Sequence, residues 1–201
     1  KGHYIDTKHP IISENLMGIK RKLGVKQISK KPILLNDLKL IIQAITDEKN
    51  EFKKIQNKAL ILIGFAGGFR RSELVSIDYD DVDFVNEGVK INIKKSKTDQ
   101  IGIGMVKAIP YFENTKFCPV VSLKDWINYA KINSGRIFKI SDKSVALIIK
   151  KYALISGLDH SKYAGHSLRS GFATSTAETG ADERSIMAMT GHKTTQMVRR
   201  Y

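Results

Sequence analysis

The sequence predicts a mainly α-helical domain with one small antiparallel β-sheet, an α+β fold. Apolar residues recur at helical spacing through most of the chain. One short stretch instead alternates apolar and polar residues, and a second such stretch is ended by a proline. At 201 residues, 42% of them hydrophobic, the chain is long enough for one substantial domain and too apolar to be disordered.

The first part of the chain predicts three helices and a linker. Ser13 is a candidate N-cap for a short amphipathic helix that contains LMGIKRKL. Residues 25–32 are basic and show no clear period, which is typical of a linker, so residues 1–24 look like the end of a preceding domain. Asn36 is the candidate N-cap of the next helix, and a longer helix, FKKIQNKALILIGFAGG, is expected to stop at the pair Gly67 and Gly68.

The β-sheet is expected in the middle of the chain. The segment VKINIKKSK alternates apolar and polar residues, as a half-buried strand does. A polar turn at residues 98–104 leads to MVKAIP, the predicted partner strand, which Pro110 ends. The rest is expected to be nearly all helical. The predicted helices there are VSLKDWINYAK, KSVALIIKKYALISG, SLRSGFATSTAETG and DERSIMAMTG.

Composition limits the function classes. The chain has 34 Lys and Arg against 20 Asp and Glu, a formal net charge of +14, which favours a polyanionic partner. The single cysteine, Cys118, excludes a disulfide framework and a cysteine-rich zinc site, and with Trp126 it is expected in the core. No apolar run is long enough to cross a bilayer and the first residues lack a signal-peptide core, so we expect a cytosolic protein that contacts no membrane.

Two stretches place cations beside groups that can move protons. In GGFRRSEL, Arg70 lies at the start of a helix and Glu73 lies one turn further along. The carboxylate can hold the guanidinium in a fixed orientation, from which two N–H groups can bind a phosphate. A surface Arg–Glu pair would show the same pattern. In HSLRSGFAT, His166 and Arg169 share a helix face and can grip one phosphodiester, although a capping histidine is also common.

Two further stretches add candidates. Lys97 lies in KKSKTD at the tip of the predicted hairpin, where most lysines are solvated or contact phosphate without catalytic consequence. His192 lies in GHKTTQMVRRY, nine positions before Tyr201.

In this order, the motifs resemble those of the tyrosine recombinases, or phage integrases. They are an arginine in G-F-R-x-S-E-L, a lysine on a β-hairpin, H-x-L-R, G-H, and a tyrosine nine residues later. The resemblance covers residues 33–201, the family's catalytic domain. It implies that residues 1–24 are the C-terminal remnant of the family's core-binding domain and residues 25–32 the linker. Phe69 and Thr190 stand where the family commonly has leucine, and we expect neither to carry chemistry.

The resemblance implies a site-specific recombinase that cleaves and rejoins DNA strands without metal or ATP, for integration or excision of a mobile element. Tyr201 would attack a phosphodiester to form a 3′-phosphotyrosyl link, and Lys97 would protonate the leaving 5′-oxygen. Arg70 and Arg169 would bind the non-bridging oxygens. Because a phenol has an ordinary pKa of about 10, the nucleophile needs such help to ionise.

The remaining roles also follow from the resemblance. His166 would assist the phenol's proton or contact the phosphate, His192 would donate a hydrogen bond to the phosphate, and Glu73 would orient the Arg70 region. The implied partner is double-stranded DNA with attachment sites, on which the full-length protein would form a homotetramer. The protein would be bacterial or phage-encoded, cytoplasmic and associated with the nucleoid. The implied DNA-binding residues are Lys20, Arg21, Lys22, Lys94 and Lys95.

Other functions remain open at this point. A type IB topoisomerase shares this chemistry but relaxes supercoils as a monomer. A DNA-binding regulator on the same fold would lack catalysis, although every catalytic position here is filled. The acidic run DYDDVDF could hold Mg²⁺, as clustered carboxylates do in nucleases, but an Asp-rich turn accounts for it and we expect no metal site.

Overall fold

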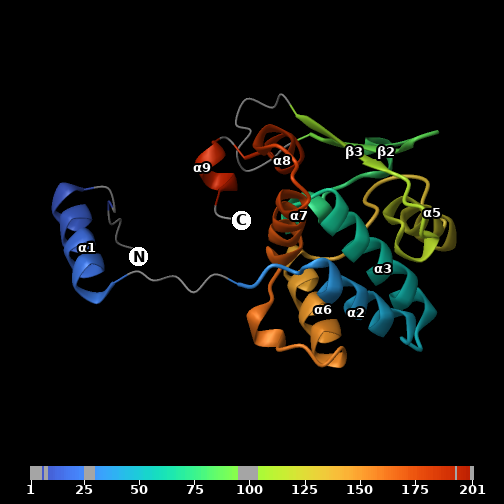
Figure 1. Ribbon diagram of the computed structural model, residues 1–201, viewed down its shortest axis with the longest axis horizontal. Coiled ribbons are helices and arrows are strands. Elements are labelled where there is room, and N and C mark those ends of the chain that lie inside the picture. The colour runs from blue at the N-terminus through green and yellow to red at the C-terminus, as the bar shows by residue number, and fades with distance from the viewer. Residues whose placement is uncertain (1–5, 7–8, 25–29, 95–103, 193, 200–201) are drawn as a thin grey trace, which may run out of the picture.

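The computed structural model describes residues 6, 9–24, 30–94, 104–192 and 194–199. From residue 30 onward the helices form one body, and a three-stranded antiparallel sheet lies at one side of it (Figure 1), so the predicted fold class is confirmed. The helices are α1 (Pro10–Leu23), α2 (Leu35–Thr46), α3 (Glu51–Ala66), α4 (Arg71–Val75), α5 (Pro119–Tyr129), α6 (Asp142–Ile155), α7 (Ser167–Glu178), α8 (Glu183–Thr190) and α9 (Thr195–Val198). The strands are β1 (Val82–Val85), β2 (Gly88–Ile93) and β3 (Met105–Pro110), and short 3₁₀ turns are η1 (Tyr79–Asp81), η2 (Thr115–Phe117) and η3 (His160–Lys162).

The first helix differs from the prediction in where it begins. α1 starts at Pro10, whose fixed φ suits the first helical turn, so Ser13 lies inside the helix and its hydroxyl donates to the Pro10 carbonyl. None of the residues of α1 is buried, and Figure 1 shows the helix apart from the main body. The amphipathic helix therefore exists, but within the described residues no core covers its apolar side.

The start of α2 was also predicted wrongly, because a tertiary contact sets it. The N-cap is Leu34 instead of Asn36. The preceding residue, Ile33, is fixed by its backbone N–H, which donates to the carbonyl of Ser167 at 3.0 Å. This contact brings the chain into the helix two residues early and overrides the preference of asparagine for the capping position.

The sheet contains the predicted hairpin and one strand more. In β2, Val89, Ile91 and Ile93 are buried, as the alternation predicts. β3 pairs with β2 so that Val89 lies opposite Ile109 and Ile91 opposite Lys107. The additional strand, β1, pairs with the other edge of β2; its sequence carries no clear strand signal, because none of its residues is fully buried and it follows an acidic turn.

The core lies mainly around α3, whose N-cap is Asn50. The helix ends at Gly67, the first of the two glycines predicted to stop it. Cys118 and Trp126 are both buried, which confirms the prediction for them. The indole N–H of Trp126 donates to the carbonyl of Ile137 at 3.0 Å, and its ring meets Phe52 edge to face at 5.0 Å. Within the part of the chain that the structure describes, no helix combines the length and apolarity that a membrane span requires.

α7 approaches the segment before α2 very closely. A Cβ at Gly171 would lie 2.0 Å from the carbonyl oxygen of Ile33, so only glycine allows the two backbones to come this near. The same segment is held at Lys31, whose N–H donates to the carbonyl of Lys162 at 2.8 Å. The beginning of the helical body is thus held to α7, the helix that carries Arg169, and to η3 just before it.

Candidate active site

Arg70 is positioned by a sharp turn at the end of α3. Gly68 has a φ of +55°, a left-handed conformation that glycine adopts without strain, and the chain then reaches Arg70 at the N-cap of α4. The guanidinium lies 2.5 Å from Oε1 of Glu73, and Oε2 of Glu73 accepts the backbone N–H of Arg70 at 3.0 Å. Because Glu73 is only 2% exposed, a buried carboxylate holds both ends of the arginine.

The neighbouring arginine is placed differently. Nε of Arg71 lies 3.0 Å from Oδ2 of Asp142 at the start of α6, in a pair whose side chains are 49% and 38% exposed. Arg70, in contrast, is only 20% exposed at its side chain. Of the two adjacent arginines, Arg71 therefore serves a surface ion pair and Arg70 is the one held by a buried carboxylate.

A second guanidinium is attached to the same turn. Arg169, in the first turn of α7, is 1% exposed, and its Nη1 donates to the carbonyl of Gly68 at 2.9 Å. The backbone that leads to Arg70 is thus bonded directly to Arg169. His166 occupies the N-cap position of the same helix, with part of its side chain open to solvent and part withdrawn from water.

His192 is brought to this turn by the end of α8. Gly191 ends α8 in a left-handed conformation with φ +64°. Its carbonyl oxygen accepts a long hydrogen bond of 3.5 Å from Nη2 of Arg70. The next residue, His192, is half-buried, and its Nδ1 lies 2.8 Å from the hydroxyl oxygen of Thr190. The helix end therefore fixes the imidazole beside the Arg70 turn.

The two arginines and two histidines form one electrostatic cluster. Desolvation, and then the charges of Arg169 and Arg70, lower the pKa of His166 from its ordinary value. The same causes, with smaller contributions from His166 and Lys107, lower the pKa of His192 to about 4. Both imidazoles are thus neutral at pH 7 beside two permanent cations. A phosphodiester would fit such a cluster, because its negative charge would be stabilised by the two guanidinium groups.

Three predicted site residues lie outside the described residues: Lys95, Lys97 and Tyr201. The described helix nearest to Tyr201 in sequence is α9. Its Val198 is buried in a small cluster with Ala173 of α7 and Ile186 of α8. The chain is therefore still packed on the Arg169 helix three positions before the tyrosine.

The other predicted DNA-binding residues lie elsewhere. The residues Lys20, Arg21 and Lys22 occupy the last turn of α1 and are exposed. Lys94 follows β2, and its Nζ lies 2.7 Å from Oδ1 of Asp81. The structure does not bring these side chains to the arginine–histidine cluster.

The acidic run at residues 78–84 stabilises a turn before the sheet. The carboxylate of Asp81 accepts the backbone N–H of Asp78 at 3.2 Å across η1 and also pairs with Lys94. Among the residues described, no three His, Cys, Asp or Glu side chains are grouped closely enough to hold a metal ion. These carboxylates close a turn and anchor the start of the sheet.

Two buried side chains that the sequence analysis did not assign to the site contact it. Lys107 donates from Nζ to the carbonyl oxygens of Gly67, at 2.6 Å, and of Met189. Thr190 is fully buried and contacts the imidazole that follows it. The alternation of β3 was a usable signal, since the period that buries Ile109 also turns Lys107 inward.

Comparison with known sequences places these features in a family. The profile of the phage integrase family matches residues 33–201. An integrase/recombinase XerD homologue of Selenomonas ruminantium is 43% identical over 212 residues, which cover all of this chain and 62% of that protein. A tyrosine recombinase XerC of Syntrophus aciditrophicus is 29% identical over 160 residues, 73% of this chain and 48% of that protein. The chain thus spans about half to three fifths of the length of these relatives.

Solved structures show the same fold. The XerH site-specific recombinase, in a pre-cleavage complex with its difH substrate, superposes with a TM-score of 0.69 at 19% identity, over 85% of this chain and 49% of that one. The XerA recombinase gives a TM-score of 0.66 at 18% identity, over 98% of this chain and 70% of that one. With the family profile matched over the whole helical body and sheet, the chain belongs to the phage integrase family.

Proposed function

We propose that the protein is a tyrosine-type site-specific DNA recombinase, which cleaves and rejoins DNA strands through a 3′-phosphotyrosyl intermediate. One observation carries the proposal: Arg70, His166, Arg169 and His192, from three separate helix ends, meet in one positively charged cluster. Family membership and the net charge of +14 support a DNA substrate. XerH, a recombinase of similar fold, is bound to its difH DNA substrate.

The two guanidiniums would bind the non-bridging oxygens of the scissile phosphate. Each is already fixed before DNA arrives, Arg70 by Glu73 and Arg169 by the Gly68 carbonyl. Donors that need no reorganisation stabilise the extra charge of a pentacoordinate transition state most effectively. Two permanent cations also supply charge that divalent ions supply in other nucleases, so the proposed reaction uses neither metal nor ATP.

One histidine would accept a proton and the other would bind the phosphate. A neutral His166 can accept the phenolic proton of the nucleophile, because its lowered pKa leaves a ring nitrogen unprotonated at pH 7. His192 would donate a hydrogen bond to a phosphate oxygen. Because Nδ1 of His192 already bonds Thr190, the donor to the phosphate must be Nε2, which carries a hydrogen only in the imidazolium form. The negative charge of a bound phosphodiester favours that protonated form.

Tyr201 would be the nucleophile and Lys97 the general acid. The phenolic oxygen of Tyr201 forms a bond to phosphorus as the bond from phosphorus to the 5′-oxygen breaks. The phenolic proton passes to His166, and a proton from Lys97 goes to the departing 5′-oxygen. The phosphotyrosyl bond keeps the energy of the broken diester, so the reverse attack by a 5′-hydroxyl reseals a strand.

The remaining assignments concern the whole protein. Residues 1–24 would be the end of a core-binding domain and residues 25–32 a linker, with Lys20–Lys22, Lys94 and Lys95 contacting the DNA backbone. The exposed apolar side of α1 supports this, since such a surface suits packing against further protein. A homotetramer would assemble on attachment sites of a mobile element, in the bacterial cytoplasm.

A covalent-capture experiment tests the proposal. The full-length protein is incubated in excess EDTA with nicked, randomised duplex DNA, and protein-linked DNA is recovered after denaturation and sequenced. We expect adducts enriched in one sequence for the wild type and none for Tyr201→Phe, which should still bind DNA. Salt-sensitive binding without any adduct would instead indicate a non-catalytic regulator. Adducts without sequence preference, with relaxation of supercoiled DNA, would indicate a topoisomerase.

A further inference from the structure

Lys107 is a buried cation between two helix ends. It is 0% exposed, on the inward face of β3. Its ammonium donates to the carbonyl of Gly67 at 2.6 Å and to that of Met189, and it lies 4.7 Å above the ring of Phe69. Two carbonyl oxygens and one aromatic face thus surround a charge that is withdrawn from water.

Each of the two carbonyls belongs to a segment that carries part of the proposed site. Gly67 is the C-cap of α3, and three residues later the chain reaches Arg70. Met189 lies in the last turn of α8, three residues before His192. The last carbonyls of a helix lack partners within the helix and carry its partial negative charge, so one ammonium satisfies two such ends together.

Lys107 also connects the sheet to these ends. β3 is the strand that follows residues 95–103, in which Lys97 lies. Through one side chain, the strand is bonded to the Arg70 turn and to the His192 turn. An apolar residue would fill the same space without linking the two carbonyls.

We propose that Lys107 is a positioning residue of the cleavage site, which holds the Arg70 and His192 turns in register and places a positive charge behind the bound phosphate. The inference rests on the proposed function. Lys107 would not touch the substrate. It would act through the two turns and through its field on His192.

The charges around Lys107 support a role beyond packing. Burial, followed by the charges of Arg169 and Arg70, lowers the pKa of Lys107 to about 7, while the carboxylate of Glu73 opposes this effect. The charge of Lys107 in turn contributes to the low pKa of His192. A bound phosphodiester would favour the ammonium form, so DNA binding would be linked to proton uptake near neutral pH.

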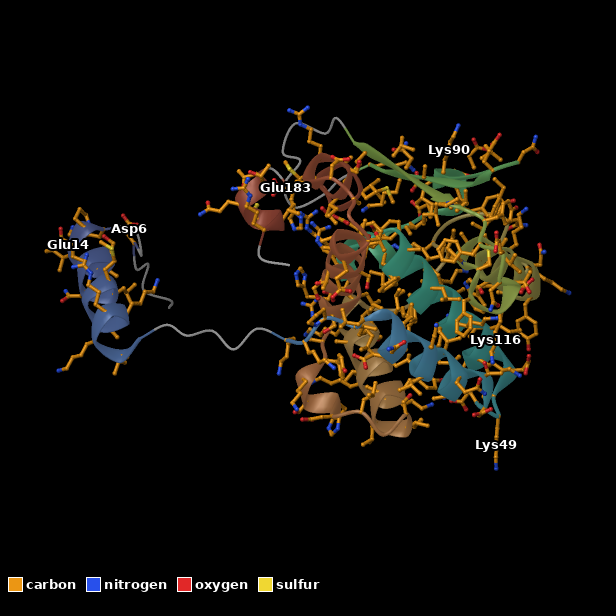
Figure 2. All side chains as sticks on the ribbon, in the orientation of Figure 1. Asp6, Glu14, Lys49, Lys90, Lys116 and Glu183 are labelled. Atoms are coloured by element: carbon orange, nitrogen blue, oxygen red, sulfur yellow. The ribbon has the colours of Figure 1, made fainter. Side chains whose placement is uncertain are left out.

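The test uses Lys107→Met, which keeps the length of the side chain without its charge, and Lys107→Arg, which keeps a permanent charge. The matched control is Lys90→Met on the outer face of the same sheet, where Figure 2 shows Lys90 pointing away from the protein. Two quantities are measured in the full-length protein: the single-turnover rate of covalent adduct formation as a function of pH, and the titration of the His192 imidazole by NMR without DNA.

We expect Lys107→Met to slow adduct formation about 100-fold, the loss that a small misplacement of reacting groups causes, with DNA affinity close to that of the wild type. The pKa of His192 should rise toward its ordinary value in Lys107→Met. Lys107→Arg should recover much of the rate and lose the pH dependence near 7. Lys90→Met should behave as the wild type.

A wild-type rate and an unchanged His192 titration in Lys107→Met would overturn the inference. If Lys107→Met does not fold, an identical pH profile for wild type and Lys107→Arg would overturn it. If the wild type itself forms no adduct, the proposed recombinase function fails. The His192 titration, which needs no activity, still tests the link between Lys107 and the histidine.

Discussion

The hydroxyl oxygen of Thr190 lies 2.8 Å from Nδ1 of His192 and 2.6 Å from the carbonyl oxygen of Ile186. A hydroxyl carries one hydrogen, and a carbonyl oxygen can only accept. The hydrogen of Thr190 therefore goes to Ile186, and Nδ1 of His192 is the donor to Thr190. The neutral imidazole is held as its Nδ1–H tautomer, and Nε2 is the nitrogen that gains a proton.

Thr190→Val should disturb this tautomer without changing the shape of the side chain. Nδ1–H of His192 would lose its acceptor, so we expect a mixture of tautomers by nitrogen-15 NMR. Adduct formation should slow about tenfold, part of the roughly 100-fold or more that a positioned acid–base group contributes. Thr46→Val is the control, because the Thr46 hydroxyl makes the same bond to a carbonyl four residues back, at the end of α2. Equal rates for the two variants would contradict the tautomer assignment.

The low pKa of His192 predicts that folding stability falls in mild acid. In the unfolded chain the imidazole takes up its proton near pH 6.5, whereas in the folded protein it does so near pH 4. Between these values the unfolded state binds more protons, so the free energy of unfolding decreases as pH falls through this window. After a discount for the solvent that reaches a half-buried ring, the loss is about 2 kcal/mol.

Urea unfolding of the wild type and of His192→Asn, followed by circular dichroism, measures this loss. The free energy of unfolding of the wild type should fall more steeply than that of His192→Asn as the pH is lowered through the window. Parallel curves for the two proteins would show that His192 does not titrate as described.

Glu73→Gln should separate binding from chemistry. The variant removes the charge that fixes the Arg70 guanidinium while keeping one oxygen for its backbone N–H. We expect adduct formation to slow about 100-fold because the fork is no longer aligned. DNA affinity should be equal or higher, since a negative charge beside the phosphate is gone.

The control for this variant is Glu51→Gln, which disrupts an exposed pair with Lys54 at the same i,i+3 spacing. Such exposed pairs contribute little, so its rate and affinity should match the wild type. A Glu73→Gln variant with unchanged rate and weaker binding would refute the orienting role.

Gly171→Ala should destabilise the helical body. The new Cβ would lie 2.0 Å from the Ile33 carbonyl oxygen, so α7 and the segment before α2 must separate. We expect a loss of about 3 kcal/mol, measured by urea unfolding. Gly18→Ala in α1 is the comparison: its Cβ would meet nothing within 4 Å, and alanine there should leave stability equal or slightly higher.

Local sequence signals predicted much of the fold. Two glycines predicted the end of α3, and strict alternation predicted the inward residues of β2, because both depend on a few neighbouring residues. The start of α2 could not be predicted in this way. A backbone bond from Ile33 to Ser167 sets it, and nothing near Asn36 indicates that bond.

Some residues of the candidate site can likewise be found from local sequence, and others cannot. Its arginines and histidines lie in motifs that a reader of the sequence can find. Lys107 does not, since its two carbonyl partners are 40 and 82 positions away along the chain. The bond of Thr190 is hidden for another reason: leucine is common at this position in the family, and leucine has no hydroxyl that could bond the histidine.

The edge-to-face contact between Trp126 and Phe52 has a practical consequence. The chain contains one tryptophan, and its indole is 2% exposed in the core beside α3. Fluorescence excited selectively at this indole is therefore a single-site optical signal of core packing. A change in its emission would report that a variant had loosened the core, and a constant emission would show that the packing around Trp126 is intact in a variant that has lost activity.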